Sequence, residues 1–526
     1  MGVGGSTLIA TRAGGGATNP ATVKVSGVRA PLPPLGRAAR ARLQTLRGTP
    51  ALWVLTALLI AGALLRVLLV QRDRPGFLGY PDTGAYLLDA TDPHGVFFDP
   101  LRIIGYGFFL RVMSGVSDEL FTVMVLQHVL GLATAALLYG AARRAGVRSR
   151  WAAVPAAAVV LLGGAQLLFE HAILSEALWT FLITACVYAV VRAQAAGAAS
   201  GRVPWSVVAG ALFAGSMLVR LPSVFFAPVL LVWLAAFAHG GRRGRALAVL
   251  PAVVVALVGL GLFRAEHEDQ TGRAGFTRNG VMNVYGRVAP WADCTRFTPP
   301  AGTRFLCETA PVEERAGHDA YIFSRSPAVN AYGVGGVAAA LPPEGARLIA
   351  RWSRAAILGQ PLTYLKAVAY ESRRLVDHDI APGLPGQTAF GFGQIAAGYP
   401  PLLQSTERDV FITPLITAGW PKTGGDRKGV AFFEGLESAT RPPPLVFAAV
   451  YALLLVAIPA ARGPERRAAL LFVPLAVFGL LGPIFSAVYD WRYVVPMFGF
   501  AAAAAGIGGW AVIVATGGRL AARRRT

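Results

Sequence analysis

The chain has 526 residues, of which 54% are hydrophobic and only 15% are charged, and its formal net charge is +21. This composition excludes a soluble globular protein and a disordered chain, and it predicts a protein that crosses a membrane many times. The basic residues gather in short runs beside apolar segments, so we attribute the positive charge to membrane topology and expect no nucleic-acid partner.

The first predicted element is a tail, residues 1–50, which is rich in Gly, Ala, Pro and Arg and has no apolar core. We expect this tail to be disordered and cytoplasmic, and we see no cleavable signal peptide in it. Ten later runs approach the ~20 apolar residues that a helix needs to cross the hydrocarbon core. The predicted spans are 51–70, 119–141, 151–168, 173–191, 204–220, 222–238, 245–263, 444–461, 468–488 and 493–515.

The predicted fold class is therefore an all-α polytopic membrane protein of about ten transmembrane helices, with a large mixed extracytoplasmic insert. Seven spans form a membrane core over 51–263, and the polar insert covers 264–442. Three more spans follow over 443–515, and 516–526 is a basic cytoplasmic tail.

The basic runs predict the orientation of these spans. They include "RRAGVRSR" (143–150), "RRGR" (242–245) and "RGPERR" (462–467), and all of them fall on the side of the N-terminus. Cytoplasmic loops carry the excess of Lys and Arg, so both termini are predicted to be cytoplasmic. The insert and the loop between the first two spans are then extracytoplasmic.

The insert contains two of the three cysteines, Cys294 and Cys307, in the segment "DCTRFTPPAGTRFLC". We predict an extracytoplasmic disulfide between them. A metal pair is a weaker explanation, because the segment has neither CxxC spacing nor a nearby His.

A helix is predicted over 346–376, with one apolar and one polar stripe at helical spacing. Such a helix can lie on the membrane surface or pack on the core of the insert, and the sequence leaves both open. Residues 379–442 are rich in Gly, Pro and aromatics and are predicted to form long loops that cover a substrate. The stripes are Leu362, Leu365, Ala369 and Val376, and Lys366, Tyr370, Arg373 and Asp377.

The segment "GYPDTGAYLLDA" (79–90) places two carboxylates, Asp82 and Asp89, directly after the first span. Pro81 and Asp82 predict a helix start, with Asp82 as a natural N-cap. The following apolar segment returns the chain to the membrane, so we expect this helix at the outer interface.

Three further ionisable groups of residues lie at the same predicted depth. Charges at the edge of the hydrocarbon are costly and usually line a cavity, although a single one is more often a paired or snorkelling residue. Because several occur at one depth, we predict a functional site there. The residues are Glu170, His171 and Glu176 in "FEHAILSEALWTF", Arg220 in "MLVRLPSVFF", and Asp490 and Arg492 in "VYDWRYVVPMF".

The order of these motifs resembles the GT-C superfamily of polyprenyl-phosphate-sugar-dependent glycosyltransferases. This superfamily includes protein O-mannosyltransferases, aminoarabinose transferases and mycobacterial arabinofuranosyltransferases. The resemblance covers the membrane core and rests on "YPDTGAY" (80–86), "RIIGYGFFL" (102–110), "LSEALWTFL" (174–182), "VRLP" (219–222) and "WRYVVP" (491–496). It implies a GT-C-like arrangement of the helices, with the active site on the extracytoplasmic side.

The resemblance also implies roles for individual residues. Asp82 would be the base that takes the proton of the acceptor, and Glu176 would orient it. We expect burial to raise the pKa of Asp82 into a useful range. Arg220 and Arg492 would hold the phosphate of a lipid-linked sugar donor. Apart from the resemblance, we predict supporting roles for Tyr80, Asp89, His171, Tyr493 and Arg373, and for His171 a structural role is favoured over a catalytic one.

Many family members carry a pair of adjacent acids where this chain has Asp82 followed by Thr83. The sequence therefore leaves open whether a divalent cation binds, and we assign no metal ligand. The acidic runs "EHED" (266–269) and 377–379 could hold a cation, but such juxtamembrane runs are usually solvated.

The sequence thus predicts a multi-pass glycosyltransferase of the cell membrane. Its partners would be a polyprenyl-phosphate-linked sugar, membrane lipids, and a glycan, lipid or protein acceptor of the cell envelope. The alternative is a transporter or flippase of lipid-linked sugars, which would use the same arginines without a base. A third interpretation is a scaffold whose insert binds a partner.

Overall fold

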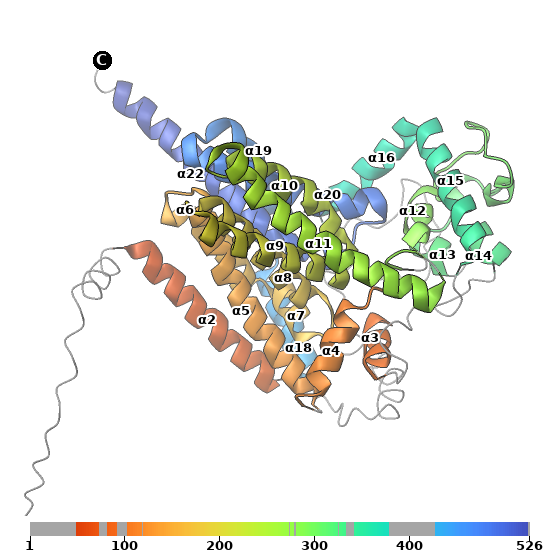
Figure 1. Ribbon diagram of the computed structural model, residues 1–526, viewed down its shortest axis with the longest axis horizontal. Helices are drawn as coiled ribbons and strands as arrows, with labels where there is room; N and C mark the ends of the chain where they lie inside the picture. Colours follow the sequence, from red (N-terminus) through yellow and green to blue (C-terminus); the bar gives the residue numbers. More distant parts are fainter. Residues whose placement is uncertain are drawn as a thin grey trace, which may run out of the picture. The chain divides into compact units, whose positions relative to one another are not determined.

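The computed structural model describes residues 49–72, 81–91, 102–117, 119–272, 274–277, 280–323, 326–332, 341–377 and 427–523. The chain divides into two units, Met1–Pro50 and Ala51–Thr526, and the account below concerns the second. The described residues of this unit form helices joined by loops, with no strand among them (Figure 1). The chain is therefore an all-α polytopic membrane protein, as predicted.

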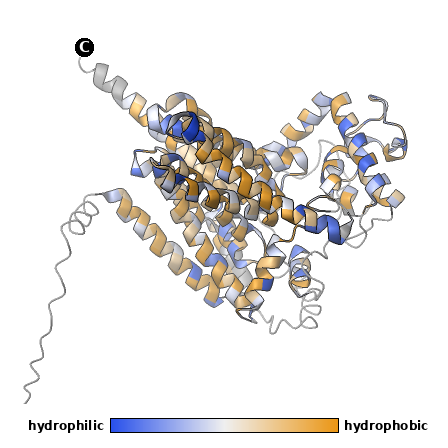
Figure 2. Ribbon diagram, in the orientation of Figure 1, coloured by the Kyte–Doolittle hydropathy of each residue, from blue (hydrophilic) through white to orange (hydrophobic). Residues whose placement is uncertain are grey.

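Seven of the described segments are long and apolar enough to cross a membrane. Each matches one of the predicted spans, and in Figure 2 the apolar residues concentrate on these long helices. The helices are α2 (Pro50–Arg72), α5 (Leu120–Ala145), α8 (Glu176–Ala195), α9 (Ala199–Val219), α11 (Gly241–Thr271), α20 (Gly463–Ser486) and α22 (Phe498–Arg523), the last span beginning at Trp491.

The other three predicted spans are helical but shorter or bent. The segment predicted as 151–168 consists of α6 (Arg150–Leu162) and α7 (Gly164–His171), which are bent by 49° at Gly163. Two adjacent glycines give this point a low helix propensity, which accounts for the break. The remaining two are η1–α10 (Leu221–Phe237) and α19 (Pro444–Ala460), which at ~1.5 Å per residue are close to the shortest span that a membrane accepts.

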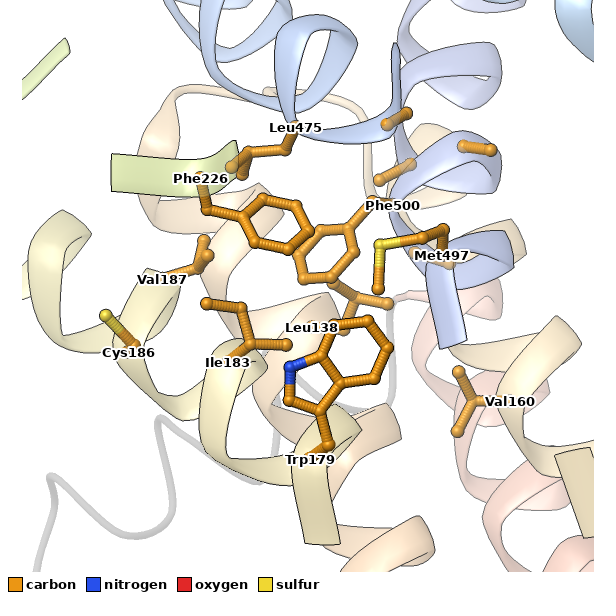
Figure 3. Close-up of a cluster of buried hydrophobic side chains, with 14 of the residues drawn as sticks. Leu138, Val160, Trp179, Ile183, Cys186, Val187, Phe226, Leu475, Met497 and Phe500 are labelled. Atoms are coloured by element: carbon orange, nitrogen blue, oxygen red, sulfur yellow. The ribbon is translucent and has the colours of Figure 1, made fainter. Parts of the chain in front are cut away.

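The core of the bundle is built from large apolar side chains and closely approaching helices. Figure 3 shows Trp179 and Ile183 of α8 packed with Phe226 and Phe500, all of them fully buried. Elsewhere small residues let backbones touch: a β-carbon at Gly210 of α9 would lie 2.3 Å from the carbonyl oxygen of Ala252 in α11. Such small-residue contacts are the usual means by which transmembrane helices pack.

The loop between the first two spans forms two short helices, α3 (Pro81–Thr91) and α4 (Gly105–Ser114). They pack against each other through the rings of Tyr86 and Tyr106, whose centroids are 4.9 Å apart. The predicted helix start at Pro81 is confirmed, but Asp82 lies inside the first turn of α3. Its carboxylate receives two arginine side chains, so its main contacts are not those of an N-cap.

The described part of the insert has its own apolar core. Five helices surround buried side chains that include Tyr285, Tyr321 and Trp352. Cys294 and Cys307 are joined in a disulfide, as predicted, with Cα atoms 5.8 Å apart. The five helices are α12 (Gly280–Val288), α13 (His318–Phe323), α14 (Pro327–Tyr332), α15 (Pro343–Gly359) and α16 (Pro361–Ser372), and α18 (Arg427–Thr440) precedes the last spans.

Candidate active site

Asp82 lies on α3 between two arginines that come from distant parts of the chain. Nε of Arg102 donates to Oδ1 of Asp82 at 2.6 Å, and Nη1 of Arg492 donates to Oδ2. The Asp82 side chain remains 24% exposed, so part of the carboxylate is open to a bound molecule. Arg102 lies three residues before α4, and the packing of α4 against α3 brings Arg102 close to Asp82.

Glu176, the first residue of α8, is the second acid of the site. Its Oε1 accepts hydrogen bonds from Nη1 of Arg220 and from Nε of Arg492. Glu176 is almost fully buried, and within the described residues its Oε2 has no hydrogen-bond partner. Arg492 therefore bridges the two predicted catalytic acids, Asp82 and Glu176.

Arg220 takes its position from a break between two helices. Helix α9 ends at Val219 and the backbone of Arg220 is extended, because Pro222 disfavours a continuing helix. The guanidinium of Arg220 also donates to Oγ of Ser175 at 3.1 Å and lies 4.7 Å from the centre of the Tyr493 ring. Tyr493, predicted as a supporting residue, therefore contacts the site.

Arg492 is held at the start of the last span by a short helix, α21 (Trp491–Val494). Asp490 caps this helix, and its Oδ1 accepts a hydrogen bond of 3.0 Å from the backbone N–H of Arg492. The side chain of Arg492 is only 10% exposed. A buried, capped and doubly paired arginine has a fixed orientation.

Two guanidinium groups change the protonation expected for Asp82. Burial of Asp82 favours its neutral form, but the charges of Arg492 and Arg102 outweigh burial and lower the pKa of Asp82. The raised pKa predicted for Asp82 is therefore wrong, because the prediction considered burial without the arginines. At Asp490, by contrast, burial outweighs the nearby arginines and raises the pKa.

A cavity of about 330 Å³ opens beside this cluster. Its wall includes Asp82, Arg102 and Arg220, together with Tyr493. The lining also includes apolar side chains and residues of the insert, among them Phe225, Pro483, Thr277, Asn283 and Val284. The cavity therefore combines charged side chains of the membrane core with residues of the insert.

A second buried network lies next to the cluster. The guanidinium of Arg66 binds both carboxylate oxygens of Glu170, at 2.7 and 2.8 Å. Nδ1 of His128 lies 3.2 Å from Glu170, and Nε2 of His128 lies 3.0 Å from Nδ1 of His171. His171 therefore belongs to a hydrogen-bonded network within the bundle.

This network is linked to the candidate active site through Gln127 of α5 and two tyrosines of the first loop. Gln127 donates to the backbone oxygens of Glu170 and Ala172 at 3.1 and 2.6 Å, and it accepts from Tyr106 at 2.7 Å. The ring of Tyr106 contacts Tyr86, whose hydroxyl lies 3.2 Å from Oγ of Ser175.

Other predicted supporting residues lie elsewhere. Asp89 is buried at the contact of α3 with α4, and Arg373 is exposed and stacks on Tyr370, with its guanidinium 3.9 Å from the ring centre. Tyr80 is outside the described residues, as are His378 and Asp379. In the part of the chain that the structure describes, no three His, Cys, Asp or Glu side chains lie close enough together to hold a metal ion.

Sequence reasoning missed Arg102 and Arg66. Arg66 stands inside an otherwise apolar span, and a charge in such a place is itself a signal of a buried partner. Arg102 carried a weaker signal, since one arginine before an apolar segment is common in interfacial loops.

No protein-family model matches the chain, and no curated protein matches it in sequence. Among solved structures, it is similar to the archaeal oligosaccharyltransferase AglB from Archaeoglobus fulgidus in complex with an inhibitory peptide and a dolichol-phosphate. The identity is 14%, the TM-score is 0.42, and the match covers 88% of this chain and 50% of that chain. It is also similar to ArnT from Cupriavidus metallidurans bound to undecaprenyl phosphate, with 12% identity, a TM-score of 0.33, and coverage of 86% of this chain and 78% of that chain.

The chain thus spans about half the length of the AglB chain. Identity and TM-score are low in both cases.

Proposed function

We propose that the chain is an integral membrane glycosyltransferase that moves a sugar from a polyprenyl-phosphate donor to an acceptor at the extracytoplasmic face. The observation that carries this proposal is a cavity lined by Asp82, Arg102 and Arg220, beside which Arg102 and Arg492 both bind the partly exposed carboxylate of Asp82. The acceptor would be a glycan, a lipid or a protein of the cell envelope.

The reaction needs two kinds of group, and the site offers both. The acceptor oxygen bonds to the anomeric carbon while the bond from that carbon to the phosphate oxygen breaks, and the electron pair passes to the phosphate. Arg220 and Arg492 would stabilise the charge that grows on this leaving group. The proton of the acceptor hydroxyl would pass to Asp82, the acid that lines the cavity.

The lowered pKa of Asp82 is compatible with this role once a donor is bound. Arg102, Arg220 and Arg492 pair with the acids of the site. A phosphate that enters would share the donors of Arg492 and add negative charge beside Asp82, and both effects would raise the pKa of Asp82. Glu176, paired with both Arg220 and Arg492, would hold these arginines in place.

A carrier of lipid-linked sugars is the competing function, and the position of the site argues against it. Carriers typically bind their substrate near the middle of the membrane, between broken helices. Here Glu176 is the first residue of α8 and Arg220 directly follows the end of α9. A site at the ends of helices, with residues of the insert in its wall, is compatible with transfer of a sugar at the membrane surface.

The orientation is part of the proposal: the termini would be cytoplasmic, and the site and insert extracytoplasmic. Single cysteines at exposed Arg245 and Ala301 test it, because Cys186 is buried and the other two cysteines are bonded. A membrane-impermeant thiol reagent added outside intact cells should label position 301 and leave 245 unlabelled. Labelling of 245 alone would reverse the orientation.

The test of the activity uses the full chain in vesicles with a radiolabelled undecaprenyl-phosphate sugar and an envelope extract as acceptor. Asp82→Asn keeps size and polarity but cannot take a proton, so transfer should fall ~10²–10⁴-fold while donor binding persists. The matched control is Asp89→Asn on the same helix, which lies outside the cavity wall and should retain most of the activity.

Normal turnover in Asp82→Asn would show that Asp82 is not the base. Movement of the labelled lipid across the bilayer without loss of its sugar would show a carrier instead.

A further inference from the structure

Three exposed leucines gather at the corner between α15 and α16. Leu358, Leu362 and Leu365 are 67%, 72% and 50% exposed, and Phe305 is the other large apolar side chain that is exposed in the described part of the insert. Single exposed leucines are ordinary on protein surfaces, but a group of them marks an interaction site. We call these three residues the leucine corner.

The sequence left open whether α16 lies on the membrane surface or packs on the core of the insert, and the burial of its side chains bears on both alternatives. The helix packs on the insert core through Ala367 and on the core of the bundle through Val368, and both residues are buried. The predicted apolar stripe, with Leu362 and Leu365 in it, faces away from that core. The stripe therefore needs another apolar environment.

The end of a transmembrane helix lies directly beside this stripe. The hydroxyl of Tyr364 donates to the backbone oxygen of Phe485 at 2.6 Å, and the two rings are 6.0 Å apart. Phe485 belongs to the last turn of α20, a membrane span, and is itself 38% exposed. In Figure 1, α16 extends sideways from the end of α20 and runs across the direction of α11. The leucine corner thus continues the lipid-facing surface of α20.

Basic side chains flank the leucine corner. Arg347, Arg351 and Arg354 follow one exposed face of α15, four and three residues apart, and Lys366 is exposed on α16. Within the described part of the chain, no hydrogen bond or ion pair involves Arg347 or Arg354. Leucines with basic residues around them are typical of segments that lie at a membrane interface, where the cations meet lipid phosphates.

We propose that the leucine corner docks into the lipid leaflet that surrounds the end of α20, with Arg354 and Lys366, the basic residues nearest to it in sequence, at the headgroup phosphates. The bilayer is favoured over a protein partner, because the span that ends at Phe485 already brings lipid to this place. Docking would hold the insert at a fixed height, and α12 of the same insert supplies Asn283 and Val284 to the cavity wall. This inference concerns the membrane surface and does not depend on the proposed catalysis.

The test uses the full chain in vesicles of phosphatidylcholine and phosphatidylglycerol, with a nitroxide on a single introduced cysteine. Leu362→Cys and Leu365→Cys report on the leucine corner, and Ala301→Cys, exposed in the same insert, is the control. Collision rates with oxygen, which concentrates in lipid, and with a water-soluble nickel complex are measured by electron paramagnetic resonance.

Labels at 362 and 365 should have an oxygen-to-nickel ratio several-fold above that at 301. Equal ratios at the three positions would place the leucine corner in water and overturn the proposal. Protection of 362 and 365 from both reagents would mean that a protein surface covers them, which would also overturn it. All three sites are exposed, so the labels should leave the thermal unfolding of the chain unchanged.

Discussion

Arg492→Lys tests the candidate active site most directly, because the contacts of Arg492 cannot be reproduced by a lysine. Arg492 directs Nη1 to Asp82 and Nε to Glu176, so one planar group serves two different acids. An ammonium is a single point charge and would keep only one of these contacts. The expected loss is one charge-assisted hydrogen bond, about 1.5–3 kcal/mol.

At about 1.4 kcal/mol for each tenfold change in rate, this loss corresponds to a fall in kcat/KM of roughly 10- to 150-fold. The matched control is Arg102→Lys. Nε and Nη2 of Arg102 both approach the same oxygen of Asp82, at 2.6 and 2.5 Å, and one ammonium can replace them. Arg102→Lys should therefore reduce transfer much less than Arg492→Lys.

Transfer is measured with the labelled donor in vesicles, and thermal unfolding in detergent shows whether each variant is folded. Full activity of Arg492→Lys would show that Arg492 only anchors the last span at the membrane interface. Equal losses in the two variants would refute the argument from contact geometry, since only Arg492 joins two acids.

Three further predictions concern other properties of the chain. Cys294 and Cys307 should resist alkylation in protein from intact membranes until a reductant is added, and full alkylation without reductant would exclude the bridge. A β-carbon at Gly131 would lie 2.0 Å from Oε1 of Glu170, so Gly131→Ala should displace this buried carboxylate from its guanidinium partner. Breaking such a pair costs ~3–5 kcal/mol, and an unchanged unfolding temperature would contradict the expectation. Because the pKa of Asp82 is lowered in the folded chain, its stabilising effect should be complete above its ordinary value near 3.8 and lost as the pH falls below it. Asp82→Asn should therefore unfold with a weaker dependence on acid than the unaltered chain, and identical acid profiles would count against this.

Much of the fold could be predicted from the sequence, because the cost of placing polar groups in lipid leaves a strong hydropathy signal. The same signal located the acids and arginines that interrupt it at one depth, so Asp82, Glu176, Arg220 and Arg492 were found before their contacts were known. The bend at Gly163 was missed, since the apolar run continues across it and hydropathy does not register a break in direction.

The electrostatic state of the site could not be predicted in the same way. The pKa of Asp82 depends on Arg102 and Arg492, which meet it only after the first loop folds back and the last span has packed. Hydropathy indicates the depth of a residue, but it does not indicate which residues of equal depth touch. For the same reason, Arg66 and Glu170 each showed as an isolated charge, and their pairing emerged only in three dimensions.

The ion pair between Asp82 and Arg492 joins residues that are 410 positions apart in the chain. A ribosome therefore releases the first half of this pair long before the second half exists. During synthesis Asp82 and Glu176 enter the membrane before Arg492 has been made. The contacts of Arg492 with both acids form only after the last span has been inserted. If the proposed function is correct, a chain that stops before the last span lacks Arg492 and should be inactive. If the last span is supplied as a separate polypeptide, it should restore activity to a chain that lacks this span.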